Sequence, residues 1–204
     1  MNIPNKIKYN GEEYDVTAIY NRAFSERQIK LKIKKIRIGN SVKRLDDNAF
    51  EGCISLLSVV IGSSISEIGY SAFYGCTRLA SIVIPSSVIS IGNYAFADCT
   101  ALKSIDIGTN VTTIGNKAFK DCLSIDTLVL PKSLAAIGDE AFAGCEKLNT
   151  IICHAEKVPI ADVSAFKYIG LKDITLRVPE LAISEYKNIA PWSNIGTLQA
   201  NSPK

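Results

Sequence analysis

Five cysteines recur at one phase of a 23-residue period, and cysteine is a side chain that can do chemistry. They are Cys53, Cys76, Cys99, Cys122 and Cys145. A sixth, Cys153, falls outside this series and is followed by the single histidine of the chain, His154. Such a series could form disulfide bonds, bind metal ions, supply a catalytic thiol or pack into a core.

The period itself helps to separate these possibilities, because it predicts stacked units with equivalent residues one above another. Stacked strands lie about 4.8 Å apart, which would bring neighbouring cysteine Cα atoms within disulfide range. Equivalent side chains have parallel Cα–Cβ vectors, so their Cβ atoms would also lie about 5 Å apart, beyond the usual ~3.8 Å of a disulfide. We therefore expect buried free thiols that act as small apolar side chains.

Disulfides, a zinc site and a catalytic thiol stay open as alternatives. Tetrahedral zinc needs ligands that converge from different directions, and no CxxC pair occurs. His154 lies at a strand end in this reading, out of phase with the cysteine series, and a lone histidine without a matched carboxylate is typical of a surface position. Glycine-rich phosphate loops and the GxSxG and HExxH motifs are absent. We expect no enzyme, no cofactor and no bound metal.

The cysteines belong to a longer repeat, LxxIxIPxSVxxIGxxAFxxCxx, which extends over about seven units in residues 16–179. The alternating segment "SIVIP" predicts a strand with Ile82 and Ile84 facing inward. The segment "SVISIG" predicts a second short extended run, with a left-handed turn at Gly92. Asn93 then suits the N-cap of a short helix or 3₁₀ turn that carries Phe96 inward.

A unit of this length cannot bury its own apolar face, so the repeats must stack as a solenoid. The unit resembles the leucine-rich repeats of BspA-like proteins, whose pattern LxxIxIPxSVxxIGxxAFxxC it matches over most of the chain. The resemblance implies an α/β repeat fold, a right-handed leucine-rich-repeat solenoid with a parallel concave sheet and short helices or 3₁₀ turns on the convex side. It also implies a bacterial cell-surface or secreted protein used for adhesion or partner binding.

The whole chain, residues 1–204, reads as one leucine-rich-repeat domain with atypical ends. Residues 1–15 predict a hairpin around Asn10-Gly11 that would cover the first rung. Residues 180–204 break the period and predict a C-terminal cap. In that cap a short amphipathic helix and an aromatic plug would draw on Leu181, Ile183, Tyr186, Ile189, Trp192 and Ile195. An exposed aromatic binding site at Trp192 is the alternative.

Composition limits the classes of partner and the locations that the chain can have. The net charge of +3 over 204 residues is too weak and too scattered for nucleic-acid binding. No run of about 18 apolar residues occurs, so we expect no transmembrane segment. The N-terminal residues show no signal peptide, which leaves a cytoplasmic location open beside the cell surface. We expect a monomer in preference to a stable oligomer.

The outward positions of the predicted strands form the candidate partner-binding surface, because a solenoid binds through aligned, variable columns. The first column runs from Lys35 to Asp173 and the second from Arg37 to Thr175. The proposed contact residues are Arg37, Ser58, Val60, Ser81, Val83, Ser104, Asp106, Thr127, Val129, Thr150, Ile152 and Thr175. A hydroxyl column thus lies beside an apolar stripe, although β-branched residues also simply stabilise strands.

Aromatic and amide side chains are scarce in these columns, which favours a protein or peptide partner over a sugar. The sequence therefore predicts a non-catalytic protein–protein interaction module. A structural or self-associating assembly unit without a dedicated ligand is the alternative.

Overall fold

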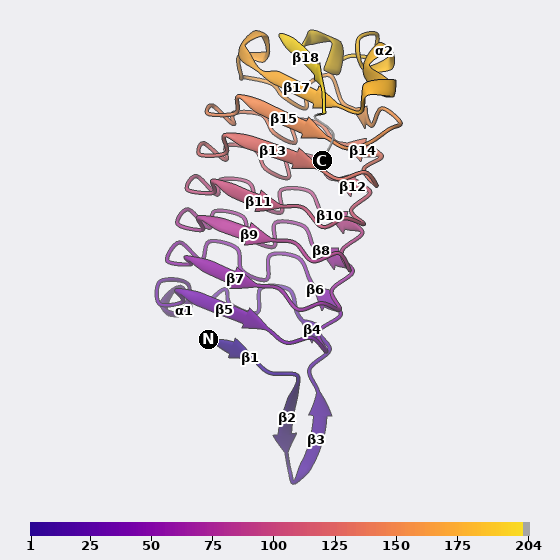
Figure 1. The fold of residues 1–204 in the computed structure, drawn as a ribbon. Coiled ribbons are helices and arrows are strands. Elements are labelled where there is room, and N and C mark those ends of the chain that lie inside the picture. Colours follow the sequence, from indigo (N-terminus) through magenta and orange to yellow (C-terminus); the bar gives the residue numbers. More distant parts are fainter. Residues whose placement is uncertain (202–204) are drawn as a thin grey trace.

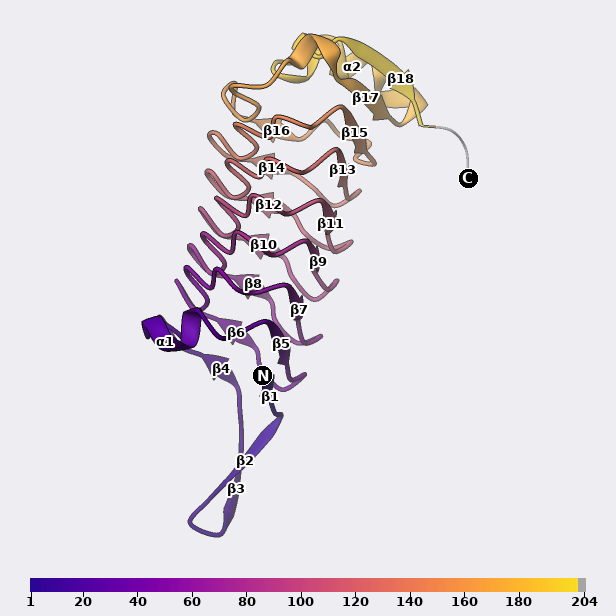
Figure 2. The same cartoon turned by 90° about the vertical axis from the view of Figure 1, so that its left-hand side faces the viewer.

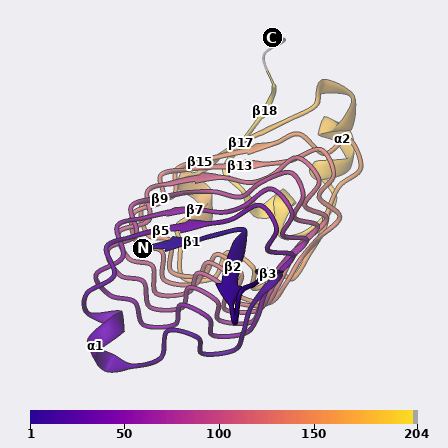
Figure 3. The ribbon, with the colours of Figure 1, turned by 90° about the horizontal axis from the view of Figure 1, so that it is seen from below.

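The computed structural model describes residues 1–201, which wind into a stack of coils with one repeat per coil (Figure 1). Each central coil contains a longer strand, a two-residue strand and a run of turns. Seen from the N-terminal end, successive coils nearly superimpose (Figure 3). The fold is therefore the solenoid of parallel strands that the repeat predicts.

The longer strands lie side by side and pair in parallel. One sheet has the order β1 (Asn2–Ile3), β5 (Lys35–Ile38), β7 (Ser58–Val60), β9 (Ser81–Val83), β11 (Ser104–Asp106). A second sheet has the order β13 (Thr127–Leu130), β15 (Thr150–Cys153), β17 (Thr175–Val178), β18 (Thr197–Ala200). We call the solvent side of these strands the long-strand face. The C-terminal cap overhangs the side of the stack on which this face lies (Figure 2).

A second parallel ladder forms from the two-residue strands, each contributed by the "SIG" part of a repeat. In spatial order they are β4 (Ala18–Ile19), β6 (Arg44–Leu45), β8 (Glu67–Ile68), β10 (Ser90–Ile91), β12 (Thr113–Ile114), β14 (Ala136–Ile137) and β16 (Ile160–Ala161). Ile91 pairs with Ile68 on one side and with Ile114 on the other. The ladder thus places an isoleucine at the inward position of five strands, with Leu45 in β6 and Ala161 in β16 at the equivalent position.

The third side of each central coil is a run of turns, and it too is a backbone ladder. Phe73 N–H donates to the Ala95 carbonyl at 2.8 Å, and Gly75 N–H donates to the Ala97 carbonyl at 2.8 Å. The short helical pieces that the sequence predicts in every repeat are found in only a few places. They are α1 (Arg27–Lys30), η1 (Leu171–Asp173), η2 (Glu180–Ala182), α2 (Ile183–Tyr186) and η3 (Trp192–Asn194).

Left-handed residues explain why this side is not helical. Tyr94 has φ 57° and Asp98 has φ 58°, and equivalent positions in other coils are also left-handed. These residues interrupt helical geometry on both sides of the Ala-Phe pair. The prediction of an N-cap at Asn93 is accordingly wrong: its Oδ1 accepts the backbone N–H of Asn116 in the next coil at 2.7 Å.

The predicted left-handed turn at Gly92 is also wrong, since the left-handed residues of that coil are Tyr94 and Asp98. Gly92 serves a different purpose. A Cβ at this position would lie 2.8 Å from the Gly69 carbonyl carbon and 2.8 Å from the Ile68 oxygen. The glycine column therefore permits the close approach of successive backbones.

Phenylalanine rings form the centre of the core. Phe96 lies 5.2 Å from Phe73 and 5.2 Å from Phe119, measured between ring centroids, and the planes differ by at most 5°. The series continues from Phe24 at one end to Phe166 at the other. The Ala-Phe column is buried from Ala49-Phe50 to Ala165-Phe166, as predicted.

The two ends of the stack differ from the prediction in part. Strands β2 (Lys6–Tyr9) and β3 (Glu12–Asp15) form the expected hairpin, but all eight residues are exposed. The hairpin points away from the first coil (Figure 1), so it does not cover that rung; β1 pairs with β5 there instead.

The C-terminal cap closes the core with aromatic side chains. Trp192 is 1% exposed, lies edge-on to Phe166 with 5.6 Å between centroids, and donates its indole N–H to the Pro159 carbonyl at 2.9 Å. The plug is confirmed, and burial excludes Trp192 as an exposed binding site. Leu181, expected in the amphipathic helix, is 97% exposed. Residues 202–204 of the predicted cap lie outside the described residues.

Candidate functional site

The long-strand face presents the two predicted columns of side chains. Register pairs Ser58 with Ser81 and Ser81 with Ser104, and it pairs Val60 with Val83. Along each strand the intervening residue points inward, as Ile82 does with 2% exposure. The strand pattern therefore places eleven of the twelve proposed contact residues in the column that the sequence assigns; the exception is Thr175.

Thr175 lies in the first column and not in the second, because the last coil is longer than the period. Thr150 pairs with Thr175, and Ile152 pairs with Arg177. One extra residue lies before β16, since Ala136 pairs with Ile160. The other lies between Phe166 and Thr175, where η1 contains Asp173, so Asp173 is not a strand residue. The second column accordingly ends in Arg177 and Gln199, and it carries a cation near each end.

An apolar stripe lies exposed in the middle of the second column. Val60 is 50% exposed, Val83 60% and Val129 38%. Asp106 interrupts the stripe between Val83 and Val129 and is the single carboxylate of that column in the described strands. The stripe is flanked by the hydroxyl groups of the first column.

The hydrogen-bonded sheet is interrupted at Asp106, which the sequence does not reveal. Strands β9 and β11 pair, and β13 and β15 pair, but β11 and β13 belong to separate sheets. The other ladders continue through this level: Thr113 pairs with Ala136, and Phe96 N–H donates to the Ala118 carbonyl. The separation is therefore local to the long-strand face.

Two hollows flank this interruption and share Val129. The larger has a volume of about 620 Å³ and is lined by Asp106, Ile107, Thr109, Val129, Pro131, Lys132, His154 and Asn201. The smaller, about 290 Å³, is lined by Lys103, Ser104, Ile105, Asp126, Thr127 and Val129. His154 is exposed, as predicted, and it lines the larger hollow beside Lys132, whose ammonium group lies 2.7 Å from Glu156. The long-strand face is therefore hollowed on either side of this interruption.

The cysteines take no part in this surface. All six are free and buried, which confirms the packing interpretation. Four donate their S–H to the phenylalanine carbonyl of the preceding coil; the Cys99 Sγ lies 3.2 Å from the Phe73 oxygen. Burial raises the pKa of Cys99 to about 12, so its thiol stays protonated at neutral pH. Within residues 1–201, no three His, Cys, Asp or Glu side chains cluster as a metal site would require.

Comparison with known families decides the chain's affiliation. The model of the BspA type leucine-rich repeat region matches residues 17–149 and 66–188, with six copies. The chain belongs to this family. The 23-residue spacing of the repeat is thus the spacing of the coils, with Phe96 and Cys99 at its buried positions. None of the described helices is long and apolar enough to cross a membrane.

Solved structures support the same fold. A leucine rich cell surface protein from Faecalibacterium prausnitzii A2-165 aligns with TM-score 0.56 and 19% identity, over 98% of this chain and 65% of that one. A leucine rich repeat protein from T. pallidum aligns with TM-score 0.54 and 23% identity, over 83% of this chain and 75% of that one. The chain thus spans less than two thirds of the Faecalibacterium protein. No curated protein sequence matches it.

Proposed function

We propose that this BspA-type solenoid is a non-catalytic module that binds a protein partner through the long-strand face. The observation that carries the proposal is the exposed stripe of Val60, Val83 and Val129 beside a hydroxyl column. Exposed apolar patches are typical of interaction surfaces, and this one is broken once, by Asp106. Arg37 and Arg177 lie near the two ends of the same column, and polar groups at the edge of an apolar patch are typical of protein interfaces.

The interruption between β11 and β13 is the proposed centre of this interface. The adjoining hollows supply depth, and side chains inserted into pockets dominate binding energy in protein complexes. The larger hollow combines the apolar Val129 and Ile107 with the charged side chains of Asp106 and Lys132. An extended peptide segment with an apolar side chain and both charge signs has the matching chemistry.

The location that we propose is the bacterial cell surface or the secreted fraction. The support is the family and the cell-surface description of the Faecalibacterium protein. Absence of a catalytic role is proposed on the buried, protonated cysteines and on the exposed position of His154 at a strand end.

Affinity capture tests the proposal, with the purified chain as bait against host extracellular proteins and a bacterial surface extract. The test variant carries Val60→Lys, Val83→Lys and Val129→Lys. The matched control carries Ile89→Lys, Ile160→Lys and Val163→Lys, three exposed aliphatic positions outside the long-strand face. A partner captured by the parent and the control but lost by the test variant supports the proposal. A partner that the test variant retains would overturn it.

A further inference from the structure

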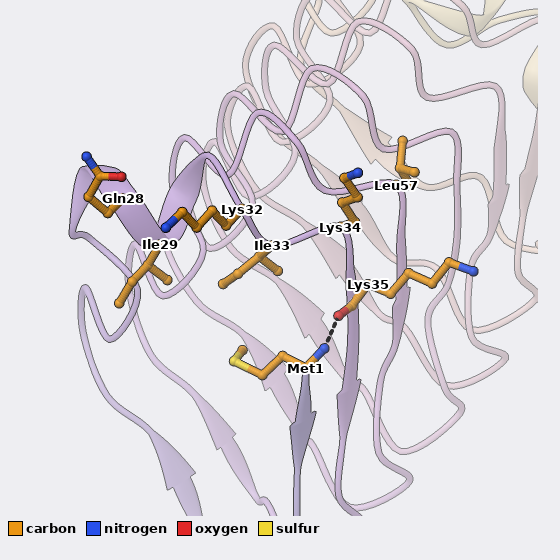
Figure 4. Close-up of a pocket in the computed structure, with 8 residues that line it drawn as sticks. All are labelled: Met1, Gln28, Ile29, Lys32, Ile33, Lys34, Lys35 and Leu57. Atoms are coloured by element: carbon orange, nitrogen blue, oxygen red, sulfur yellow. Dashed lines mark hydrogen bonds between the residues drawn. The ribbon is translucent and has the colours of Figure 1, made fainter.

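The N-terminal end of the stack carries a hollow of about 630 Å³ with an apolar floor. Ile29 and Ile33 line it beside Met1 and Leu57, and Gln28, Lys32, Lys34 and Lys35 complete the lining (Figure 4). No carboxylate is among these residues. The hollow thus combines apolar side chains with lysines, although the Lys35 side chain points away from Ile29 and Ile33 (Figure 4).

The cations around this hollow lack acidic partners. Residues 26–45 contain eight lysines and arginines and a single carboxylate, Glu26. Of these cations only Arg44 lies within 4.0 Å of a carboxylate anywhere in residues 1–201. Elsewhere in the stack, Lys120, Lys132 and Lys167 each have one. The N-terminal end therefore has a local excess of positive charge.

Further apolar surface is exposed at the same end. The register of the β2–β3 hairpin places Ile7, Tyr9 and Tyr14 on one side, with exposures of 50%, 66% and 47%. An isolated two-stranded hairpin is only marginally stable in water.

The opposite end of the same chain has the complementary chemistry. Leu181 is the most exposed large apolar side chain among the described residues, at 97%. It follows the exposed Glu180 in η2, and Glu185 lies one helical turn beyond it in α2. In residues 180–201 the carboxylates are Glu180 and Glu185, and the single cation is Lys187. We call Glu180, Leu181 and Glu185 the C-terminal wedge.

We propose that the C-terminal wedge of one copy docks into the N-terminal hollow of another, so that the solenoids associate head to tail. Leu181 would contact Ile29 and Ile33, and the two glutamates would face Lys32 and Lys34. Because hollow and wedge lie at opposite ends of the stack (Figure 1), the contact is heterologous and can continue from copy to copy. This association goes beyond partner binding through the long-strand face and leaves that face free.

Sedimentation equilibrium of the purified chain tests this, from about 10 µM to about 1 mM, where weak contacts associate. We expect the average mass to rise above 22.1 kDa with concentration, and to rise less at high salt because the lysine–glutamate attraction is screened. A hollow variant, Lys32→Glu with Lys34→Glu, and a wedge variant, Leu181→Ser with Glu185→Gln, should each stay monomeric. All four positions are exposed, so folding is preserved.

Mixing the two variants gives the decisive measurement. The wedge variant keeps an intact hollow and the hollow variant keeps an intact wedge, so an equal mixture should form a dimer and nothing longer. A control with Lys147→Glu and Lys157→Glu makes the same charge change at other exposed sites and should associate like the parent. A parent that stays monomeric throughout would overturn the proposal. So would a wedge variant that still dimerises, since the contact would then join two N-terminal ends.

Discussion

The Sγ of Cys99 lies 3.2 Å from the backbone carbonyl oxygen of Phe73, one coil earlier, and donates its hydrogen to it. The same contact recurs at Cys76, Cys122 and Cys145. The regular cysteine column is therefore a row of hydrogen bonds between coils inside an apolar core. A small side chain with a weak donor fits this position.

Buried thiols of this kind should not react with thiol reagents in the folded protein. We expect a thiol reagent to react with the native chain only as fast as it unfolds. The unfolded, unreduced chain should give close to six free thiols by Ellman titration. A result of two or fewer would mean that disulfides form and would contradict the packing account.

The raised thiol pKa values also predict a loss of stability at alkaline pH. Burial raises the pKa of Cys99 from 9.0 to about 12, so between these values the unfolded state releases a proton that the native state retains. The free energy of unfolding is then unaffected by this thiol below pH 9 and falls above it, by up to about 1.4 kcal/mol per pH unit for each such thiol. Denaturant unfolding of the parent and of Cys99→Ala between pH 8 and pH 11 checks this; the variant should show the shallower decline.

Truncation of the central ring should be costly. Phe96→Ala removes a fully buried ring that stacks on both neighbours, and we expect a loss of about 3–5 kcal/mol in the free energy of unfolding. Phe24→Ala is the matched control, because Phe24 is only half-buried and stacks on one side. Urea titration followed by circular dichroism measures both, and a loss within about 0.5 kcal/mol for Phe96→Ala would contradict the inward position.

Two glycine columns should respond differently to the same substitutions. Gly75 has φ 68° and no contact closer than 3.8 Å for an added Cβ, so Gly75→Ala should cost about 1 kcal/mol and Gly75→Asn less. Gly92 meets the preceding backbone at 2.8 Å, so Gly92→Ala and Gly92→Asn should both cost about 3 kcal/mol. If Gly92→Asn were tolerated as well as Gly75→Asn, the glycine at position 92 would be needed for its backbone conformation and not for the close approach of the preceding coil.

The asparagine ladder should make a modest contribution. Asn116 Oδ1 accepts the Asp139 backbone N–H at 3.0 Å, and Asn116→Ala removes this acceptor at a cost of about 1 kcal/mol. Asn116→Asp retains an acceptor oxygen and should be close to the parent in thermal unfolding. Equal losses in the two variants would show that the side-chain acceptor contributes nothing.

The sequence predicts the inward residues well, since burial follows directly from the alternation of each strand. It predicts the Phe96 and Cys99 columns for the same reason: stacking repeats an apolar position once per coil. It fails at Gly92, where a glycine can mean either a left-handed φ or a close approach, and only the neighbouring coil distinguishes them. It fails at Thr175 because the last coil has two extra residues, one before β16 and one between Phe166 and β17, and the repeat pattern reveals only the first.

The candidate surface is predictable only as a list of outward positions. The interruption between β11 and β13 depends on how two coils separate, and Asp106 in a valine column is its single visible sign in the sequence. The wedge at Leu181 and the hollow at Ile33 lie at opposite ends of the stack. Their complementarity emerges only when both ends are seen on one rigid body.

The ladder of phenylalanine rings also says something about how such proteins change in length. Each central coil meets its neighbours through the same stacked phenylalanine ring and the same cysteine hydrogen bond to a backbone carbonyl. Duplication or deletion of one 23-residue segment in the gene would therefore leave every remaining contact intact and move the two caps apart or together by a single coil. The spacing between the two ends of the molecule is in this sense a quantity that evolution can adjust in whole steps, independently of what either end binds.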